Sequence, residues 1–406
     1  MAQIIKRGDQ VYLIRVFLGR DESGRRNYHN ETFRGTLKDA GTRARDLERS
    51  RDTGTLIQPA SLTLGAYLEE WLKTAAKPRL ARRTFTDYSY MIGHYVPQAL
   101  RDLRLSNVTP LHVQKMYADL LVSGLSARTV RYVHAVLSSA LKQAVKWRIL
   151  AINPTDAVDL PRQRRTEMKA LTPDEAIAFQ QEAAKDPLGV LFLVAITGGL
   201  RPEEYLALQW RTDVDLSDPL RPALTINRVL VRATKGEWYF AEPKTSQSRR
   251  TVQLPSSVGA VLLRHKREQA ERRIKNPRKW KDNDLVFTTK TGTPVEMRNV
   301  RRSFRRVLEQ MFYARIEGLP EDEAKRKTEA AERAKQYRLY DLRHTCATLL
   351  LAGGEHPKVV AERLGHSNTK LTLDTYSHVL PSMQDSAAQK LEAMLFAPVV
   401  PKRVGE

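Results

Sequence analysis

The chain has 406 residues and a formal net charge of +22, with Lys and Arg spread over its whole length. This length predicts two or three domains rather than one core, and the charge favours a polyanionic partner such as nucleic acid. The single cysteine, Cys346, excludes a disulfide framework and a zinc site built from several cysteines. The N-terminal residues lack the apolar run of a signal peptide and no segment resembles a membrane span, so we expect a cytoplasmic protein without a membrane partner.

Residues 1–60 predict a small β-rich module. Runs of strand-forming residues at 4–8, 11–20 and 25–35 are separated by turn sequences, and a helix is expected over 38–54. Three strands and one helix bury only a thin core, and a β-ribbon can enter a DNA groove. The candidate DNA contacts are Arg15, Arg25, Arg26 and Arg34, with Tyr28 and His29 beside them. For any one of these residues, a place on a solvated sheet face is nearly as good an interpretation.

Residues 62–160 predict a compact domain of four helices. Thr63, Thr109 and Ser126 are expected N-caps, because each stands directly before an apolar run with helical spacing. Pro110 suits the first position of its helix. A basic linker, 160–167, then breaks the pattern.

Residues 168–395 predict a third, mainly helical domain, followed by a tail at 396–406. Thr172 and Glu175 have the spacing of a capping box at its start. The expected elements that follow are an apolar helix at 188–200, an antiparallel meander of strands at 224–231, 238–242 and 251–255, a basic helix near 256–274, a strand at 284–287, helices at 296–312 and from 341, and a solvated helical insertion at 314–335. The predicted fold class is therefore multidomain α+β: a small β-sheet module, an all-α domain, and a mainly α domain with a small antiparallel sheet.

The third domain lacks the usual sequence signals of metal or nucleotide chemistry. It has no paired carboxylates suited to Mg²⁺, no glycine-rich phosphate loop and no histidine pair at helical metal spacing. We therefore expect no metal and no other cofactor.

Cationic and phenolic side chains stand instead at the ends of its predicted elements. Arg201 follows the apolar helix, Lys244 lies in a hairpin loop, and Arg343 opens a later apolar helix. His366 and Tyr376 come after it. A guanidinium does not give up its proton, so Arg343 at the edge of a core calls for an anion. Each residue has an ordinary alternative, as a helix-end cation, a solvated lysine, a surface histidine or a core tyrosine, but together they would form a phosphate clamp with a nucleophile.

Five segments in this domain resemble the signature boxes of the tyrosine recombinases, the phage-integrase family, which includes integrases of temperate phages and conjugative transposons. They are TGGLRPEEYLAL (197–208), PKTSQSRR (243–250), DLRHTCATLLL (341–351), LGHS (364–367) and DTYSH (374–378). Their order and spacing match the family over 170–380. By the same resemblance, the helical domain looks like a core-binding domain and the N-terminal module like an arm-binding domain.

The resemblance implies a role for each of these residues. Arg201 and Arg343 would grip the non-bridging oxygens of the scissile phosphate, and Tyr376 would attack the phosphorus to give a 3′-phosphotyrosyl link. Lys244 would protonate the 5′-oxygen, and His366 would donate a hydrogen bond to the phosphate.

Three further positions in these boxes would support the site. Glu204 would orient its neighbours and His344 would buttress the site. Tyr340 departs from the family, which usually has a histidine three residues before the second arginine. This substitution leaves open which group takes the proton from Tyr376.

The implied function is that of a site-specific DNA recombinase that integrates and excises a mobile element. Its partners would be double-stranded DNA at core and arm attachment sites, three further copies of the chain in a homotetramer, a host DNA-bending protein and an excision factor. Alternatives are DNA relaxation of the type IB topoisomerase kind and a catalytically weakened DNA-binding relative. Near the C-terminus, Leu391, Met394 and Leu395 could dock on a neighbouring protomer or pack on their own domain.

Overall fold

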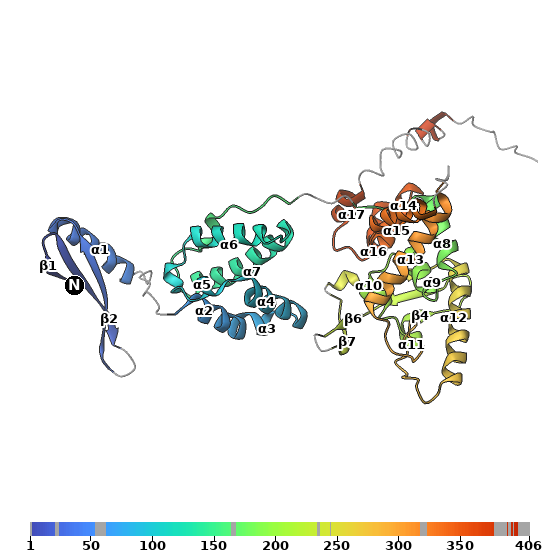
Figure 1. Cartoon of the computed structure of the whole chain (residues 1–406), viewed down its shortest axis with the longest axis horizontal. Helices are drawn as coiled ribbons and strands as arrows, with labels where there is room; N and C mark the ends of the chain where they lie inside the picture. The colour runs from blue at the N-terminus through green and yellow to red at the C-terminus, as the bar shows by residue number, and fades with distance from the viewer. Residues whose placement is uncertain are drawn as a thin grey trace, which may run out of the picture. The chain divides into compact units, whose positions relative to one another are not determined.

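A computed structural model describes residues 2–20, 24–52, 62–163, 168–233, 236–243, 245–316 and 323–376, with a few positions between 388 and 396 (Figure 1). The chain divides into two compact units, Met1–Arg165 and Thr166–Glu406. The predicted α+β fold class is confirmed. Among the described residues, no helix has the length and apolar character needed to cross a bilayer.

The N-terminal module is an antiparallel sheet covered on one face by a helix, as predicted. Strands β1 (Gln3–Gly8), β2 (Val11–Arg20) and β3 (Arg26–Arg34) pair in the order β1-β2-β3, and α1 (Leu37–Asp52) follows. The side chains buried between sheet and helix are Ile14, Val16, Ala40, Ala44 and Leu47.

The strand register sorts the candidate DNA contacts between the two faces of this sheet. Arg15 and Tyr28 lie on the face away from α1, where the Arg15 guanidinium stands 3.9 Å from the Tyr28 ring centroid. Arg26 and Arg34 share the alternation of Tyr28 and belong to the same open face. His29 pairs with Val16 and therefore faces α1, so its expected place in a DNA groove was wrong.

Arg25 precedes β3 and is exposed. It lies next to the open face without belonging to the strand itself.

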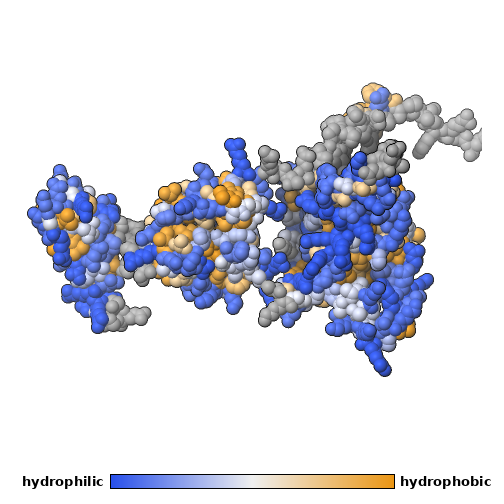
Figure 2. All heavy atoms as spheres, in the orientation of Figure 1, coloured by the Kyte–Doolittle hydropathy of each residue, from blue (hydrophilic) through white to orange (hydrophobic). Residues whose placement is uncertain are grey.

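The helical domain consists of α2 (Leu64–Trp71), a π-helical turn (Leu72–Ala76), α3 (Lys77–Arg79), α4 (Arg82–Tyr95), α5 (Gln98–Arg101), α6 (Pro110–Val122) and α7 (Ala127–Lys146). The three predicted caps are confirmed, because the side chains of Thr63, Thr109 and Ser126 each accept a hydrogen bond from a backbone N–H three residues later. Buried Tyr67, Trp71 and other apolar side chains form its core. Figure 2 shows hydrophobic side chains on the visible face of this domain.

The third domain is mainly helical and contains two small sheets. In chain order its elements are α8 (Pro173–Ala183), α9 (Gly189–Gly198), α10 (Pro202–Tyr205), α11 (Trp210–Asp213), β4 (Val214–Asp215), β5 (Ala223–Ile226), β6 (Val229–Arg232), β7 (Trp238–Ala241), β8 (Arg250–Gln253), α12 (Ser256–Lys275), α13 (Met297–Arg315), α14 (Glu323–Lys335), α15 (Asp341–Ala352), α16 (Pro357–Leu364) and α17 (Thr369–Tyr376). The predicted capping box of Thr172 and Glu175 is present at the start of α8. A cluster of three rings, Phe179, Phe192 and Phe304, lies in the core.

Two strand predictions in this domain were wrong. The expected meander is split, since β5 pairs with β4 and β8 while β6 and β7 form a separate hairpin. In the segment 284–287, Leu285, Val286 and Phe287 are buried, but the described bridge is an isolated one between Leu285 and Gln209. A run of apolar residues predicts that a segment is buried. Whether the segment also pairs as a β-strand depends on which other segment lies beside it in the fold.

The expected solvated insertion at 314–335 was wrong for its described helix, α14. In α14, Ala330 and Ala334 are fully buried, and the helix packs against α13. Alanines do not stand out as an apolar stripe in the sequence, so the contact between α14 and α13 was missed there. Their small side chains nevertheless let two helices approach closely.

Gly199 is required at the end of α9, two residues before Arg201, the first candidate arginine. Its φ is +62°, and an added Cβ would lie 2.7 Å from Leu364 Cδ2 and 3.2 Å from Cys346 Sγ. We expect Gly199→Ala to lower the free energy of unfolding by about 2–4 kcal/mol, from left-handed strain and overpacking together. Urea unfolding checks this. Gly93→Ala, in an exposed helical position with open space, should be neutral or slightly stabilising; equal effects of the two changes would contradict the argument.

Candidate active site

Arg343 lies in the first turn of α15 and is almost completely buried, with 1% of its surface exposed. Its Nη1 donates to the carbonyl of Gly199 at 2.7 Å, and its Nη2 donates to the carbonyl of Leu364. Burial, and then the nearby Arg201 guanidinium, lower the pKa of Arg343 to about 10. The group therefore keeps its charge at neutral pH, in surroundings that favour an anion.

Arg201 is held at the start of α10 by Glu204. The Glu204 carboxylate accepts from the Arg201 backbone N–H at 2.9 Å and from Nη1 at 2.6 Å, and Arg201 Nη2 donates to the carbonyl of Gly365 at 3.3 Å. Burial acts to lower the pKa of Arg201, but the Glu204 charge outweighs it and the pKa is raised. Burial likewise acts to raise the pKa of Glu204, but hydrogen bonds and charge from Arg250, and the charge of Arg201, leave it lowered.

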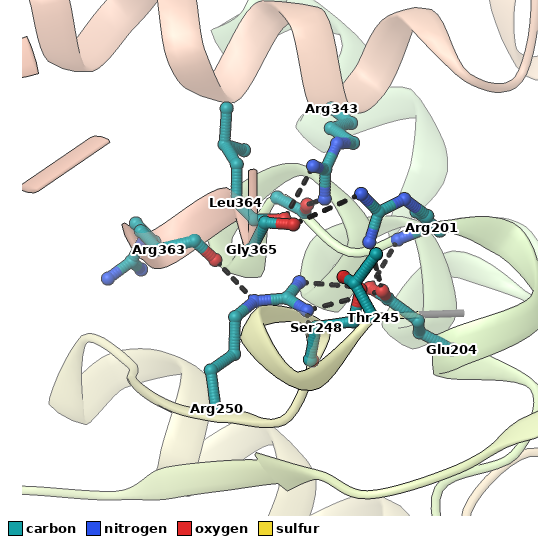
Figure 3. A network of polar contacts seen from close by, with 10 residues as sticks. Arg201, Glu204, Thr245, Ser248, Arg250, Arg343, Arg363, Leu364 and Gly365 are labelled. Carbon is teal, nitrogen blue, oxygen red and sulfur yellow. Dashed lines mark hydrogen bonds and ion pairs between the residues drawn. The ribbon is translucent and has the colours of Figure 1, made fainter. Parts of the chain in front are cut away.

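Arg250, the first residue of β8, joins this cluster and was missed in the sequence. Its Nη1 and Nη2 both donate to Glu204, at 3.2 and 2.9 Å, and its Nε donates to the carbonyl of Arg363 at 2.6 Å. Two guanidinium groups, those of Arg201 and Arg250, thus share the buried carboxylate of Glu204, while Arg343 bonds only backbone carbonyls in its described contacts (Figure 3). With three guanidinium groups near one carboxylate, the cluster carries an excess of positive charge.

A signal for Arg250 was present in the sequence. Of the consecutive arginines at the start of β8, Arg250 is 7% exposed and Arg249 is 53% exposed. Alternation along a strand requires one of two neighbours to point inward, although the sequence alone does not say which.

His366 follows α16 beside the arginine cluster. Its Nδ1 lies 2.7 Å from Thr372 Oγ1. Burial, and then the charges of Arg343 and Arg201, lower the pKa of His366 to about 4. The ring is therefore neutral at neutral pH, and its engaged Nδ1 leaves Nε2 as the nitrogen suited to a phosphate oxygen.

Tyr376, the last residue of α17, is 2% exposed and meets His344 directly. The Tyr376 hydroxyl lies 2.6 Å from His344 Nδ1. Burial raises the pKa of Tyr376, and burial followed by the Arg343 charge lowers the pKa of His344 to about 4. A neutral imidazole can accept the tyrosine O–H, so His344 lies closer to the nucleophile candidate than the buttressing position expected for it.

Tyr340 occupies the rim of the site. It is 37% exposed, its ring centroid is 5.2 Å from that of His344, and Arg343 Cζ lies 6.0 Å from its ring centroid. The residue at the position that departs from the family therefore touches the same histidine that contacts Tyr376.

Lys244 lies outside the described residues. The turn that follows it is described: Thr245 Oγ1 and Ser248 Oγ are 2.9 Å apart, and an added Cβ on Gly365 would lie 3.1 Å from the carbonyl oxygen of Gln247. This turn is therefore packed against the residue that precedes His366. Near the C-terminus, the described Leu391, Met394 and Leu395 are exposed.

The depressed pKa of His344 predicts a pH-dependent stability. An unfolded histidine takes up its proton near pH 6.5, whereas folded His344 does so near pH 4, so stability is lost as pH falls from 6.5 to 4 and the loss is complete below 4. Between pH 7 and 4.5, wild type should lose about 2 kcal/mol more unfolding free energy than His344→Asn, which keeps an acceptor for Tyr376. Urea unfolding at both pH values checks this; equal losses in the two proteins would contradict it.

A buried tyrosine beside clustered arginines and a neutral histidine is an arrangement suited to phosphoryl transfer through a tyrosine nucleophile. The profile described as "Phage integrase family" matches residues 169–383, and that described as "Phage integrase, N-terminal SAM-like domain" matches residues 63–121. The chain therefore belongs to the phage integrase family and is a DNA-binding, tyrosine-type site-specific recombinase.

Individual relatives agree with this membership. The "Tyrosine recombinase XerC-like" protein of Caldanaerobacter subterraneus subsp. tengcongensis is 28% identical over 95% of this chain and 97% of its own length. Among solved structures, the Tn1549 transposon integrase bound to a circular intermediate DNA has a TM-score of 0.65 at 20% identity, over 82% of this chain and 100% of that one. A lambda integrase tetramer bound to a Holliday junction has a TM-score of 0.51 at 16% identity, over 92% and 94%. These two structures show a shared fold.

Proposed function

We propose that this protein cleaves and rejoins attachment-site DNA through a 3′-phosphotyrosyl intermediate on Tyr376, and that it thereby integrates and excises a mobile element. The observation that carries the proposal is the arginine cluster with its excess positive charge next to the buried Tyr376–His344 pair. A phosphodiester carries one negative charge, and more charge builds on its non-bridging oxygens as a nucleophile attacks.

Arg201 and Arg343 would bind the scissile phosphate. The described hydrogen bonds occupy only part of the five N–H donors of each guanidinium, and the backbone carbonyls that hold Arg343 keep its fork in one orientation. Cations held rigidly in a site that excludes water stabilise developing charge without reorganising. His366 would add a hydrogen bond from Nε2.

The cleavage step then transfers two protons. The Tyr376 oxygen forms a bond to phosphorus while the bond from phosphorus to the 5′-oxygen breaks, and the phenolic proton passes to His344 Nδ1, its contact at 2.6 Å. Lys244 gives a proton to the departing 5′-oxygen. Under this proposal His344, the histidine that follows Arg343, takes the proton from Tyr376, and Tyr340 does not.

Rejoining reverses these steps with a new 5′-hydroxyl as the attacking group. The phosphotyrosyl bond keeps the energy of the original phosphodiester, so the exchange is close to thermoneutral. The partner strand therefore determines whether the outcome is integration, excision or restoration of the original DNA.

The wider assembly follows from the same proposal. Residues 62–160 and 168–395 would hold the core site, and the open sheet face with Arg15, Arg26 and Arg34 would hold an arm site, with Arg25 beside it. Four copies would act on two duplexes, as the lambda integrase structure contains a tetramer on a Holliday junction. A host bending protein and an excision factor would assist in the cytoplasm, and Leu391, Met394 and Leu395 would dock on a neighbouring copy.

Trapping the covalent intermediate tests the proposal. Wild-type protein incubated with a nicked core-site duplex in EDTA should form a denaturant-resistant protein–DNA complex, and peptide mapping should place the adduct on Tyr376. Failure of wild type to form any adduct would refute the enzymatic reading. Strand exchange between two duplexes, compared with relaxation of a supercoiled plasmid, distinguishes recombination from topoisomerase-like activity.

A further inference from the structure

Arg250 is the side chain of the arginine cluster that is most completely engaged by the protein itself. Its described bonds run to both oxygens of Glu204, to the carbonyl of Ser248 at 3.0 Å and to the carbonyl of Arg363 at 2.6 Å. These bonds occupy Nε, Nη1 and Nη2 and leave the group 7% exposed. Arg250 is therefore built to hold protein segments together rather than to bind a ligand.

The three segments that it joins each lead to a different part of the reaction. Ser248 ends the turn that begins after Lys244, Glu204 anchors Arg201, and Arg363 stands three residues before His366 (Figure 3). The planar guanidinium of Arg250 has several donors in fixed directions and can bond all of these segments at once. A lysine has a single ammonium group and cannot replace these bonds.

Loss of Arg250 would affect the turn that ends at Ser248 more than it would affect Arg201. Arg201 keeps two bonds to Glu204 and one to the Gly365 carbonyl, none of which involves Arg250. By contrast, Arg250 supplies the described hydrogen bonds that link the Ser248 end of the turn to α16 and to Glu204. Arg250 also packs closely against Gly365, since a Cβ added to Gly365 would lie 2.9 Å from Arg250 Nη1.

We propose that Arg250 is a positioning residue that holds the turn at 245–248 against the phosphate-binding arginines, so that Lys244, the residue before this turn, can give its proton to the leaving 5′-oxygen. This inference rests on the proposed function. A misplacement of about 1 Å at a reacting group can cost about 10²-fold in rate. Arg250→Lys should therefore slow the cleavage of a normal phosphodiester by about 10²-fold, while the charge opposite Glu204 is retained.

A substrate with a 5′-bridging sulfur at the scissile phosphate isolates the leaving-group step, because a thiolate departs without being protonated. On this substrate Arg250→Lys should cleave within a few-fold of wild type. A deficit of the same size on both substrates, or no deficit on the normal one, would overturn the proposal. If Arg250 had a purely structural role, Arg250→Lys would show a deficit of the same size on both substrates.

Arg249→Lys is the matched control, because it makes the same chemical change one residue earlier on an exposed side chain. It should cleave both substrates like wild type. Thermal unfolding and core-site binding by Arg250→Lys are measured in parallel to show that the variant is folded and binds DNA. If wild type itself forms no covalent complex, the proposed function fails; if wild type cleaves and Arg250→Lys behaves identically, only this inference fails.

Discussion

Tyr376→Phe should abolish the covalent protein–DNA complex, with a loss of about 10⁶-fold or more in cleavage. Phenylalanine has no oxygen that could form a bond to phosphorus, so no neighbouring group can compensate. Core-site DNA binding should be unchanged, because Tyr376 is buried and the basic residues remain. The measurement is gel detection of the complex on nicked core-site DNA, together with a binding titration.

Removal of the hydroxyl should also cost a small amount of stability. The Tyr376 oxygen is the described partner of His344 Nδ1, and an unbonded buried nitrogen costs about 1–3 kcal/mol. Tyr313→Phe is the matched control, since Tyr313 packs on Arg326 and is not among the site residues; it should form the complex normally. A complex that persists in Tyr376→Phe and disappears in Tyr340→Phe would identify the rim tyrosine as the nucleophile and contradict the proposed chemistry.

Arg343→Ala should reduce cleavage by about 10³-fold or more, the second largest effect that the structure predicts. The change removes a buried cation that repels Arg201 and that is proposed to bind the scissile phosphate. It also leaves the carbonyls of Gly199 and Leu364 without their described donor, so some loss of stability is expected. Cleavage rates at saturating DNA, measured below the unfolding temperature of the variant, separate the two effects.

Cleavage of a substrate whose scissile phosphate carries no charge tests whether Arg343 acts on the phosphate. On a core site with a methylphosphonate at this position, one negative charge is absent from the start, so the need for a cation is reduced. Arg343→Ala should then recover most of the lost activity relative to wild type on the same DNA. Arg211→Ala, which removes an arginine whose side chain is 80% exposed, should be active on the normal site. An equal defect of Arg343→Ala on both substrates would show that Arg343 only maintains the fold.

Much of the site was visible in the sequence because its residues stand where elements begin or end. Arg201 follows the glycine break after α9, and Arg343 opens α15. Packing of apolar neighbours does not explain a polar side chain at such a point, so it indicates a functional role. The order of these motifs along the chain identified the family. The N-caps and the capping box were equally accessible, because they depend on residues three positions apart.

Contacts between distant segments could not be read in this way. Arg250 and Arg363 are 113 residues apart, and His344 and Tyr376 are 32 apart, so no local spacing connects them. The same limit explains the strand pairing of β5 with β8 and the burial of Ala330 against α13, since both depend on which surface the chain meets after it folds.

The sequence by itself therefore determined the fold class, the family and the two arginines and tyrosine proposed for catalysis, since these follow from local patterns and from motif order. Only the tertiary structure decided that a third arginine completes the cluster, that His344 touches Tyr376, and that His29 faces the helix rather than a DNA groove. The physical reason is that a side chain's charge state and hydrogen-bond partners depend on burial and on neighbours from other segments, which packing alone brings together.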